Sequence, residues 1–300
     1  MKKKVLVLMS TYNGQKYVID QINSIMDNND SYTVCFLIRD DGSTDNTINV
    51  IEEKYSDESV SIIKGNNIGS CYSYLELIKC APVNYDYYAY CDQDDIWLSE
   101  KIEQAVGQLE DIDIDKPALY FCGQRITDEN LNPLYEHKMD KRRSVYANCI
   151  FNQMAGCTAM FNRKMMDELK KHVPKDILGH DAWTYRLCAS LGGTIIVDEN
   201  AYILYRQHQK NAVGLNNTIS SKLKRAKEYI FFHKPSVYAR EILSLYEEDI
   251  SDEMRVFLKI LKNANYSRRE RNQLLYSYNI RFFNWYLDVI FRVKLKLRKM

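Results

Sequence analysis

Apolar and polar positions alternate in blocks along the first 110 residues. Four apolar runs, each ending in polar turn residues, predict buried strands that start at Lys4, Thr33, Ser59 and Tyr85. Apolar residues between these runs recur at helical spacing, which predicts helices over Val18–Met26, Ile48–Tyr55, Tyr74–Ile78 and residues 98–110. Ser43 or Thr44 is the expected cap of the second helix. Alternating strands and helices predict an α/β fold with a parallel, doubly wound sheet.

The alternation loosens after residue 116. Strands are predicted over 118–126 and 156–162, a helix over 180–192, and one or two strands over 193–208. Beyond about Leu215 the pattern is helical, and Pro235 is its only break. We therefore expect one domain over residues 1–215, built of halves 1–115 and 116–215, and a helical extension over 216–300.

Charge is distributed unevenly along the chain. Residues 221–300 hold 18 Lys and Arg against 9 Asp and Glu, a net charge of +9, although the whole chain carries only +1. The remaining residues are therefore acidic, at −8. An acidic body with a basic tail indicates that the tail has a partner or surface of its own.

Composition fits an ordinary globular protein, with 46% hydrophobic and 27% charged residues. No apolar run approaches the roughly 18 residues that a membrane span needs. The apolar run after Lys4 is too short for a signal peptide, and we interpret it as a strand. The 8 cysteines form neither a CxxC pair nor a cluster with histidine, which predicts reduced core thiols and a cytoplasmic location.

Polar clusters follow three of the predicted strands, at residues 11–13, 40–43 and 92–95. Parallel strands bring their carboxyl ends to one edge of a sheet, where such folds bind ligands. A solvated turn explains any one cluster taken alone. Three clusters on one edge, two of them with adjacent acids, favour a binding site.

The cluster Asp92-Gln93-Asp94-Asp95 has the character of a site for a hard divalent cation. Mg²⁺ and Mn²⁺ prefer oxygen ligands and commonly bind one or two carboxylates together with substrate phosphates. A calcium loop is disfavoured because its sixth position, Trp97, should be glycine. Neither a P-loop nor GxGxxG follows the first strand. The expected phosphate neutraliser is therefore Mn²⁺ or Mg²⁺.

Four segments together resemble the successive motifs of the inverting GT-A glycosyltransferases of family 2: "STYNGQKYVIDQINSI", "IRDDGSTDNT", "NNIGSCYSYLELI" and "YAYCDQDDIW". The "DQDDIW" form resembles a bacterial branch assigned as rhamnosyltransferases of surface polysaccharide synthesis. The resemblance covers residues 4 to about 110. It implies a GT-A fold, a nucleotide-sugar donor held by residues 1–115, a divalent metal, and an acceptor half over 116–215.

The resemblance also implies roles for residues of the donor half. Thr11, Tyr12, Asn13 and Asn67 line the nucleotide pocket. Either Asp40 or Asp41 accepts a hydrogen bond from the pyrimidine base, and the pattern does not decide between them.

The acids of "DQDD" receive different roles from the resemblance. Asp92 matches the acid on the ribose or sugar side, and Asp94 matches the acid on the metal side. Asp95 is either a second metal ligand or an orienting neighbour. The alternative for Asp95 is a charge that favours the start of the following helix.

Attack by an acceptor hydroxyl needs a general base, worth roughly 10²–10⁴ in rate. The family places an acidic pair at the start of a helix in its second half, and the matching segment here reads His180-Asp181. Asp181 is favoured because it stands where the family's base stands, and His180 is the other candidate. The alternative is that Asp181 only caps the helix. Trp183 is either an acceptor-stacking wall or a core residue.

The segment "YRQHQKNAVG" follows the last predicted strand. His208 is a candidate third metal ligand, because neutral imidazole binds Mn²⁺, and a structural histidine is the alternative. Arg206 or Lys210 is the candidate contact for the donor diphosphate. Gly156 and Cys157 are expected to mark close backbone approach near the acceptor rather than thiol chemistry.

The resemblance, together with the site pattern, implies a cytoplasmic, metal-dependent transferase that adds one sugar, with rhamnose as the first expectation, to a growing surface glycan. The rival enzyme is a sugar-nucleotide nucleotidyltransferase, which would normally carry a Gly-rich basic loop after the first strand. The rival of another class is a noncatalytic nucleotide-sugar or glycan binding module. The expected partners are the donor and a glycan acceptor, with lipid linkage and a homo-oligomer left open, and no nucleic acid.

The basic tail ends in an amphipathic pattern. One apolar face is predicted to hold Phe282, Trp285, Tyr286, Val289, Val293 and Leu297. Its cations are Arg292, Lys294, Lys296, Arg298 and Lys299. Such a helix can lie in a membrane interface and keep the enzyme peripheral at the inner face of the membrane. A helical cap or an oligomer interface that buries the same face is the alternative.

Overall fold

The computed structural model describes residues 2–27, 31–56, 58–208, 226–278 and 280–300. It divides the chain into two compact units. Unit 1 comprises Met1–Met139, Met154–Val173 and Gly193–Lys210, and unit 2 comprises Asp140–Gln153, Pro174–Gly192 and Asn211–Met300. The domain boundary predicted at residue 215 lies outside the described residues.

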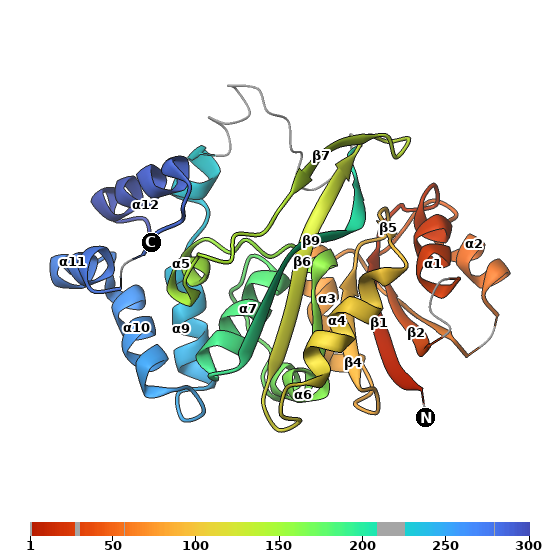
Figure 1. Cartoon of the computed structure of the whole chain (residues 1–300), viewed down its shortest axis with the longest axis horizontal. Coiled ribbons are helices and arrows are strands. Elements are labelled where there is room, and N and C mark those ends of the chain that lie inside the picture. The colour runs from red at the N-terminus through yellow and green to blue at the C-terminus, as the bar shows by residue number, and fades with distance from the viewer. Residues whose placement is uncertain (1, 28–30, 57, 209–225, 279) are drawn as a thin grey trace. The chain divides into compact units, whose positions relative to one another are not determined.

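Unit 1 is built on a 9-stranded sheet whose main path runs β3-β2-β1-β4-β8-β6-β9-β5, with β7 paired to β6 (Figure 1). The four strands predicted from the first apolar runs are confirmed: β1 (Lys3–Thr11), β2 (Tyr32–Asp40), β3 (Val60–Lys64) and β4 (Tyr87–Cys91). Neighbours among these four strands pair in parallel. Their carboxyl ends, and the polar clusters that follow β1, β2 and β4, therefore share one edge of the sheet.

The central strand β1 is apolar on both faces because helices cover both faces. Val5, Val7 and Met9 belong to one core cluster with residues of α1 (Val18–Met26), α2 (Thr47–Lys54) and α4 (Glu100–Glu110). By alternation along the strand, Leu6 and Leu8 point to the opposite face, where α3 (Ser70–Cys80) contacts β1 and α6 (Arg163–Lys171) contacts β4.

The cap predicted for α2 is wrong. Asn46 is the N-cap residue, and the helix begins at Thr47. Ser43 instead donates its hydroxyl to Asp40, and Thr44 donates both its backbone N–H and its hydroxyl to the side-chain oxygen of Asn13. Both side chains therefore build the loop after β2 rather than the helix end.

The second half of the sheet mixes strand directions. The segment 193–208 forms one 13-residue strand, β9 (Thr194–Arg206), which runs parallel to β6 (Ala118–Thr127). Residues 156–162 divide into a 3₁₀ turn, η1 (Gly156–Thr158), and the short strand β8 (Met160–Asn162), antiparallel to β4 and β6. Two strands were not predicted, β5 (Ile96–Trp97) and β7 (Pro133–His137).

Unit 2 is helical in its described residues. Its helices are α5 (Val145–Ile150), α7 (His180–Ser190), α9 (Pro235–Leu245), α10 (Asp252–Asn263), α11 (Arg268–Tyr276) and α12 (Trp285–Leu297). Side chains of Ser144, Ser251, Ser267 and Asn284 cap the N-termini of α5, α10, α11 and α12. The prediction that the tail is helical is confirmed. No helix within the described residues has the length and apolar character needed to cross a bilayer.

The apolar face predicted for α12 is exposed at Trp285, Val289 and Leu297, so the helical-cap alternative, which buries that face, is wrong for these residues. Ile290, Phe291 and Leu295 are buried, whereas Trp285 and Val289 are exposed to 78% and 50%. A different stripe from the predicted one therefore faces the core of unit 2.

Lys294, which was predicted on the basic surface, is buried instead. Its ammonium group donates to the backbone carbonyls of Tyr229, Ile230 and His233 at 2.8, 3.2 and 2.6 Å. Burial lowers the pKa of Lys294 to about 7. Its three carbonyl partners explain how a lysine is tolerated inside the unit.

Candidate functional site

The loop after β4 carries the three acids at the carboxyl edge of the sheet. Asp92 and Asp94 are partly exposed, and Asp95 is buried. Tyr74 of α3 donates its hydroxyl to Asp92 Oδ1 at 3.2 Å and to the backbone oxygen of Cys91 at 2.7 Å. A buried phenol therefore positions the first acid of the loop.

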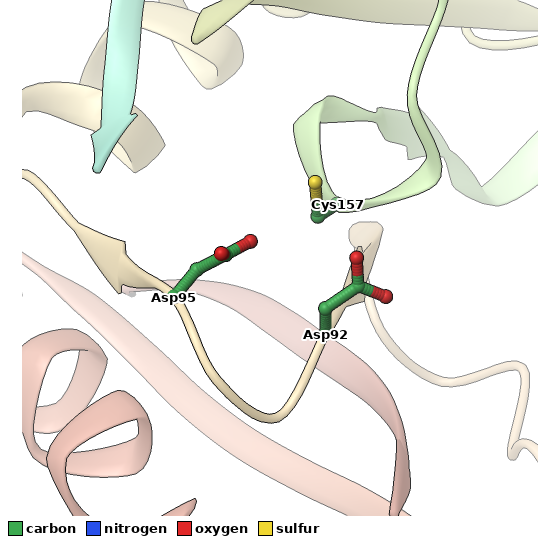
Figure 2. A group of neighbouring side chains, drawn as sticks. All are labelled: Asp92, Asp95 and Cys157. Atoms are coloured by element: carbon green, nitrogen blue, oxygen red, sulfur yellow. The ribbon is translucent and has the colours of Figure 1, made fainter. Parts of the chain in front are cut away.

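Asp95 turns inward to a small cluster with Asp92 and Cys157 (Figure 2). One ligand-type atom from each of the three residues lies within 4.8 Å of the other two. Asp95 Oδ1 accepts the backbone N–H of Arg206 at 3.1 Å, and Oδ2 has no hydrogen-bond partner among the described residues. Burial, and next the negative charges of Asp94 and Asp92, raise the pKa of Asp95. Helix α4 begins five residues later, at Glu100, so the helix-start interpretation of Asp95 is wrong.

Asp94, one residue before Asp95, faces His208. The distance from His208 Nε2 to Asp94 Oδ2 is 2.8 Å, and the two side chains are only 9% and 15% exposed. The imidazole ring stacks on Tyr17 with a centroid separation of 5.1 Å. The end of β9 therefore delivers a histidine to the second acid of "DQDD".

Arg206 fixes the backbone of the same loop. Its Nε donates to the carbonyl oxygen of Asp94 at 2.9 Å, and a terminal nitrogen donates to the carbonyl oxygen of Glu129 at 2.8 Å. The guanidinium also lies over the Tyr17 ring, 4.6 Å from its centroid. Arg206 is 5% exposed, so its main contacts are with the loop itself. Lys210, the other candidate for the diphosphate, lies outside the described residues.

The donor atoms around this loop fit a divalent cation. They comprise the carboxylates of Asp92, Asp94 and Asp95, the His208 imidazole beside Asp94, and the Cys157 thiol beside Asp92 and Asp95. The carboxylates and the imidazole are the groups among them that suit Mn²⁺ or Mg²⁺. The buried oxygen of Asp95 without a partner and the crowding of negative charge both indicate that a cation would stabilise the group.

The loop after β1 is held to the other two loops through its backbone. Gln93 accepts the N–H of Tyr12 at 2.9 Å and donates to its carbonyl oxygen at 3.1 Å. Asn13 adopts a left-handed conformation, with φ of 49°, and its side-chain oxygen accepts the N–H of Thr44 at 2.8 Å. Thr11 donates to Asp40 Oδ1 at 3.0 Å, while the Tyr12 side chain stays 47% exposed.

Asp40 and Asp41 are both buried, and their carboxylates bind different segments at the carboxyl edge of the sheet. Asp40 accepts the N–H of Ser43 at 2.8 Å, besides the hydroxyls of Thr11 and Ser43. Asp41 pairs with Arg39 at 2.5 Å and accepts two backbone N–H groups, those of Ile68 and Gly69, both at 2.9 Å. Asp41 therefore joins the end of β2 to the start of α3.

Asn67 lies in the segment between β3 and α3 that Asp41 anchors. Its side chain is exposed at this edge of the sheet. The backbone N–H of Asn67 lies close to Gly42, where an added Cβ would come within 3.0 Å of that nitrogen. Asn67 is thus available to a ligand that approaches the edge.

His180 and Asp181 form the first turn of α7 in unit 2. Asp181 Oδ1 accepts the N–H of Ala182 at 2.6 Å. Burial raises the pKa of Asp181, and burial lowers the pKa of His180 to about 3. The preceding Gly179 is the N-cap residue, and an added Cβ there would lie 2.7 Å from Asp181 Oδ1. A carboxylate with a raised pKa is a better proton acceptor than an ordinary one.

The model of the family described as "Glycosyl transferase family 2" matches residues 6–170, more than half of the chain. The chain belongs to glycosyl transferase family 2. The matched region contains most of β1, all of β2 to β8, and the three polar clusters. The predicted GT-A fold with a C-terminal helical part is likewise confirmed by similarity to solved glycosyltransferase structures.

Two relatives match most of this glycosyltransferase. It is 32% identical over 236 residues to the dTDP-rhamnosyl transferase RfbG of Shigella flexneri, covering 72% of this chain and 77% of the relative. It is 25% identical over 237 residues to TuaG of Bacillus subtilis, whose name assigns it to teichuronic acid biosynthesis, covering 78% and 88%.

Two solved structures share the fold. TarS 1-349 of S. aureus in complex with UDP-GlcNAc superposes with a TM-score of 0.58 at 16% identity, covering 99% of this chain and 82% of that chain. The mannosyltransferase PcManGT of Pyrobaculum calidifontis, in complex with GDP-Man and Mn²⁺, gives 0.55 at 14% identity, covering 100% and 89%.

Several residues that shape the site of this glycosyltransferase were not singled out from the sequence. Gln93 holds the loop after β1 through the backbone of Tyr12. Arg39 bonds Ser73 of α3 and also the nearby Asp41. Tyr74 positions Asp92. Tyr17 supports both Arg206 and His208. Trp183 is fully buried, so its core interpretation is correct and the acceptor-wall interpretation is wrong.

Proposed function

We propose that this glycosyltransferase transfers a rhamnosyl group from a dTDP-linked donor to a growing surface polysaccharide, with inversion at the anomeric carbon. The name of the 32% identical relative, a dTDP-rhamnosyl transferase, supports the choice of donor. The observation that carries the proposal is the carboxyl edge of the sheet, where the 2.8 Å Asp94–His208 pair and the inward-turned Asp95 gather metal-binding groups beside Asp92.

The proposed donor half, residues 1–115, binds the nucleotide sugar. Arg206, the last residue of β9, and His208, just after it, assist. Asp94, His208 and Asp95 hold a Mn²⁺ or Mg²⁺ ion. That ion, when bound, offsets the negative charge that develops on the departing diphosphate. Asp92, oriented by Tyr74, accepts a hydrogen bond from a hydroxyl of the donor.

Hydrogen bonds between the loops at the sheet edge fix the positions of the groups that would bind the nucleotide. Gln93 fixes Tyr12, and Asp41 fixes the turn before α3, so the nucleotide side is largely preformed. Preformed polar groups avoid the reorganisation that would otherwise accompany reaction. Either Asp40 or Asp41 provides an acceptor toward the pyrimidine, and exposed Tyr12 and Asn67 contact the nucleotide.

The proposed acceptor half, residues 116–215, contains the general base. Asp181 is the base in this proposal, because its pKa is raised and its carboxylate is fixed by the Ala182 N–H. It takes the proton of the acceptor hydroxyl as that oxygen bonds to the anomeric carbon and the nucleoside diphosphate leaves. His180 remains neutral above its pKa of about 3 and is the less suitable proton acceptor, since so low a pKa makes it a weak base.

The proposed acceptor is a lipid-linked glycan at the inner face of the membrane. The +9 charge of residues 221–300 supports this location, because that face of the membrane carries anionic lipids.

A donor screen tests the proposed function. The purified chain is supplied with a panel of dTDP-, UDP- and GDP-sugars, a rhamnan-type acceptor and Mn²⁺, and nucleoside diphosphate release is followed chromatographically with and without EDTA. Metal-dependent turnover of dTDP-rhamnose, with a product of inverted anomeric configuration, is the expected result. Turnover of a different nucleotide sugar alone would overturn the choice of donor, and undiminished turnover in EDTA would overturn the role of the metal.

A further inference from the structure

A basic groove lies between α11 and α12 of unit 2. It has a volume of about 340 Å³ and is lined by Arg268, Arg271, Asn272, Leu275, Arg292, Leu295, Lys296 and Arg298. Five of these eight lining residues are cationic, and none is acidic. Like charges gathered in one concave place repel each other, so the groove has the electrostatic character of an anion site.

Two acids, Glu270 of α11 and Asp288 of α12, lie near the groove in the sequence of its helices. Within the described residues, none of its five cations forms an ion pair with a carboxylate. In the part of the chain that the structure describes, the one side-chain hydrogen bond of these cations runs from Arg271 to the carbonyl oxygen of Ala264 at 3.0 Å. Arg268, Arg292, Lys296 and Arg298 are exposed. Their donors are therefore available to a ligand that approaches from solvent.

An exposed apolar stripe runs along α12 beside this groove. Trp285, Val289 and Leu297 are 78%, 50% and 47% exposed and share one helix face by their spacing of four and eight residues. The core of unit 2 is already filled by the separate stripe of Ile290, Phe291 and Leu295. The exposed face of α12 therefore does not contribute to the packing of unit 2.

Just before α12, Phe283 is 45% exposed, and at the end of α11 Tyr276 is 80% exposed. Aromatic side chains beside unpaired cations are typical of helices that lie in the interface of an anionic membrane. A protein partner would more commonly present carboxylates, and the stripe would then have to be matched by apolar residues on that partner. A bilayer supplies both matching groups: its anionic phosphates fit the cations of the groove, and the apolar layer beneath them fits the exposed aromatic side chains.

We propose that the groove between α11 and α12 binds phosphate groups of anionic membrane lipids while Trp285 and Val289 enter the headgroup layer. The lipid site does not depend on the donor or the sugar. Its consequence, delivery of the active site to a lipid-linked acceptor, rests on the proposed function. The proposal goes beyond a basic tail because it assigns a defined groove, including two arginines of α11, to the lipid phosphates.

Tryptophan fluorescence gives a direct test. The chain has 3 tryptophans, and Trp97 and Trp183 are 2% and 0% exposed, so Trp285 is the one that reports on solvent. The full chain is titrated with phosphatidylcholine vesicles that contain about 30 mol% phosphatidylglycerol, and with vesicles of phosphatidylcholine alone. We expect a blue shift of the emission with the anionic vesicles only, and no shift in Trp285→Phe.

Charge-reversal variants locate the lipid site. Arg292→Glu/Lys296→Glu should weaken vesicle binding by about 100-fold, since each cation near anionic lipid contributes substantially to affinity. The control Lys54→Glu/Lys116→Glu makes the same change in net charge at exposed lysines of unit 1 and should bind within about 2-fold of the parent chain. Circular dichroism of each variant verifies folding.

Other outcomes would overturn the proposal. Equal weakening by the groove and control variants would mean that net charge alone directs binding. A blue shift that appears without vesicles as protein concentration rises, together with dimers in sedimentation velocity, would assign the face to a second copy of the chain. Because these measurements use no donor or acceptor, their failure leaves the donor screen unaffected, and failure of the screen leaves them unaffected.

Discussion

Replacing Gly179 by alanine would displace the proposed base without changing any reacting group. An ideal Cβ at this position lies 2.7 Å from Asp181 Oδ1, closer than real carbon and oxygen atoms approach. The φ of Gly179 is −160°, an extended value that alanine adopts freely, so the substitution does not strain the backbone. The clash must therefore be relieved by rotation of the Asp181 carboxylate.

The size of the effect follows from what the carboxylate loses. Rotation breaks its 2.6 Å bond to the Ala182 N–H, and a hydrogen bond to a charged group is worth about 1.5–3 kcal/mol. Alanine is also a poorer N-cap residue than glycine, at a cost of up to about 1 kcal/mol. General base catalysis contributes roughly 10²–10⁴, and a misplacement of about 1 Å can remove 10² of it. We expect kcat to fall about 10- to 100-fold and the free energy of unfolding to fall by about 1.5–4 kcal/mol.

The assay compares initial rates of nucleoside diphosphate release at saturating donor and acceptor, with donor affinity measured by calorimetry. Gly107→Ala is the matched control, because an added Cβ there meets no atom within 4 Å. Gly107 lies inside α4, so alanine should stabilise the chain by about 0.5–1 kcal/mol and leave kcat unchanged. If Gly179→Ala kept more than about half of the parent kcat, close packing of Asp181 would not matter for the reaction, and the assignment of the base would be refuted.

Three further predictions concern the metal, the sheet edge and the tail. Asp94→Asn should abolish turnover and weaken Mn²⁺ binding measured by calorimetry; normal Mn²⁺ affinity would contradict it. Asp41→Asn should lower the free energy of unfolding in urea by about 3 kcal/mol, because it strands buried Arg39, and a loss below about 1 kcal/mol would contradict that reasoning. The pKa of Lys294 falls from 10.5 unfolded to about 7 folded, so the unfolded chain binds more protons between these values and stability should rise with pH there. Lys294→Met should lack that rise in the free energy of unfolding. Parallel pH profiles of unfolding free energy for the variant and the parent chain would contradict the lowered pKa of Lys294.

The parallel half of the sheet could be predicted because its strands are buried on both faces. Val5 to Met9 must all be apolar when helices cover both sides, and this leaves a continuous run in the sequence. β7 has five exposed residues, and β5 has only two residues. Such strands exist through pairing with β6 and β9 rather than through a pattern of their own, so the sequence contains no period that would indicate them.

The chemical side chains of the site could be predicted better than the residues that hold them. Asp94 and His208 were both expected at a metal, and they lie 2.8 Å apart despite a sequence separation of 114 residues. Gln93 carries no charge, and its role depends on the backbone of Tyr12, 81 residues away. Amide and phenol groups bond whichever polar atom the fold places opposite them, so their partners follow from the topology and not from residue type.

The contact between Gln93 and the turn after β1 also restricts Gly14. A Cβ at Gly14 would lie 2.1 Å from Gln93 Oε1, the atom that accepts the Tyr12 N–H. The residue at 14 and the glutamine contact at 93 are therefore coupled. In chains where residue 93 keeps a glutamine in this pose, residue 14 must remain glycine. A side chain at 14 would push the Gln93 amide aside, and the loop after β1 would then lose the hydrogen bonds that tie Tyr12 to the loop after β4.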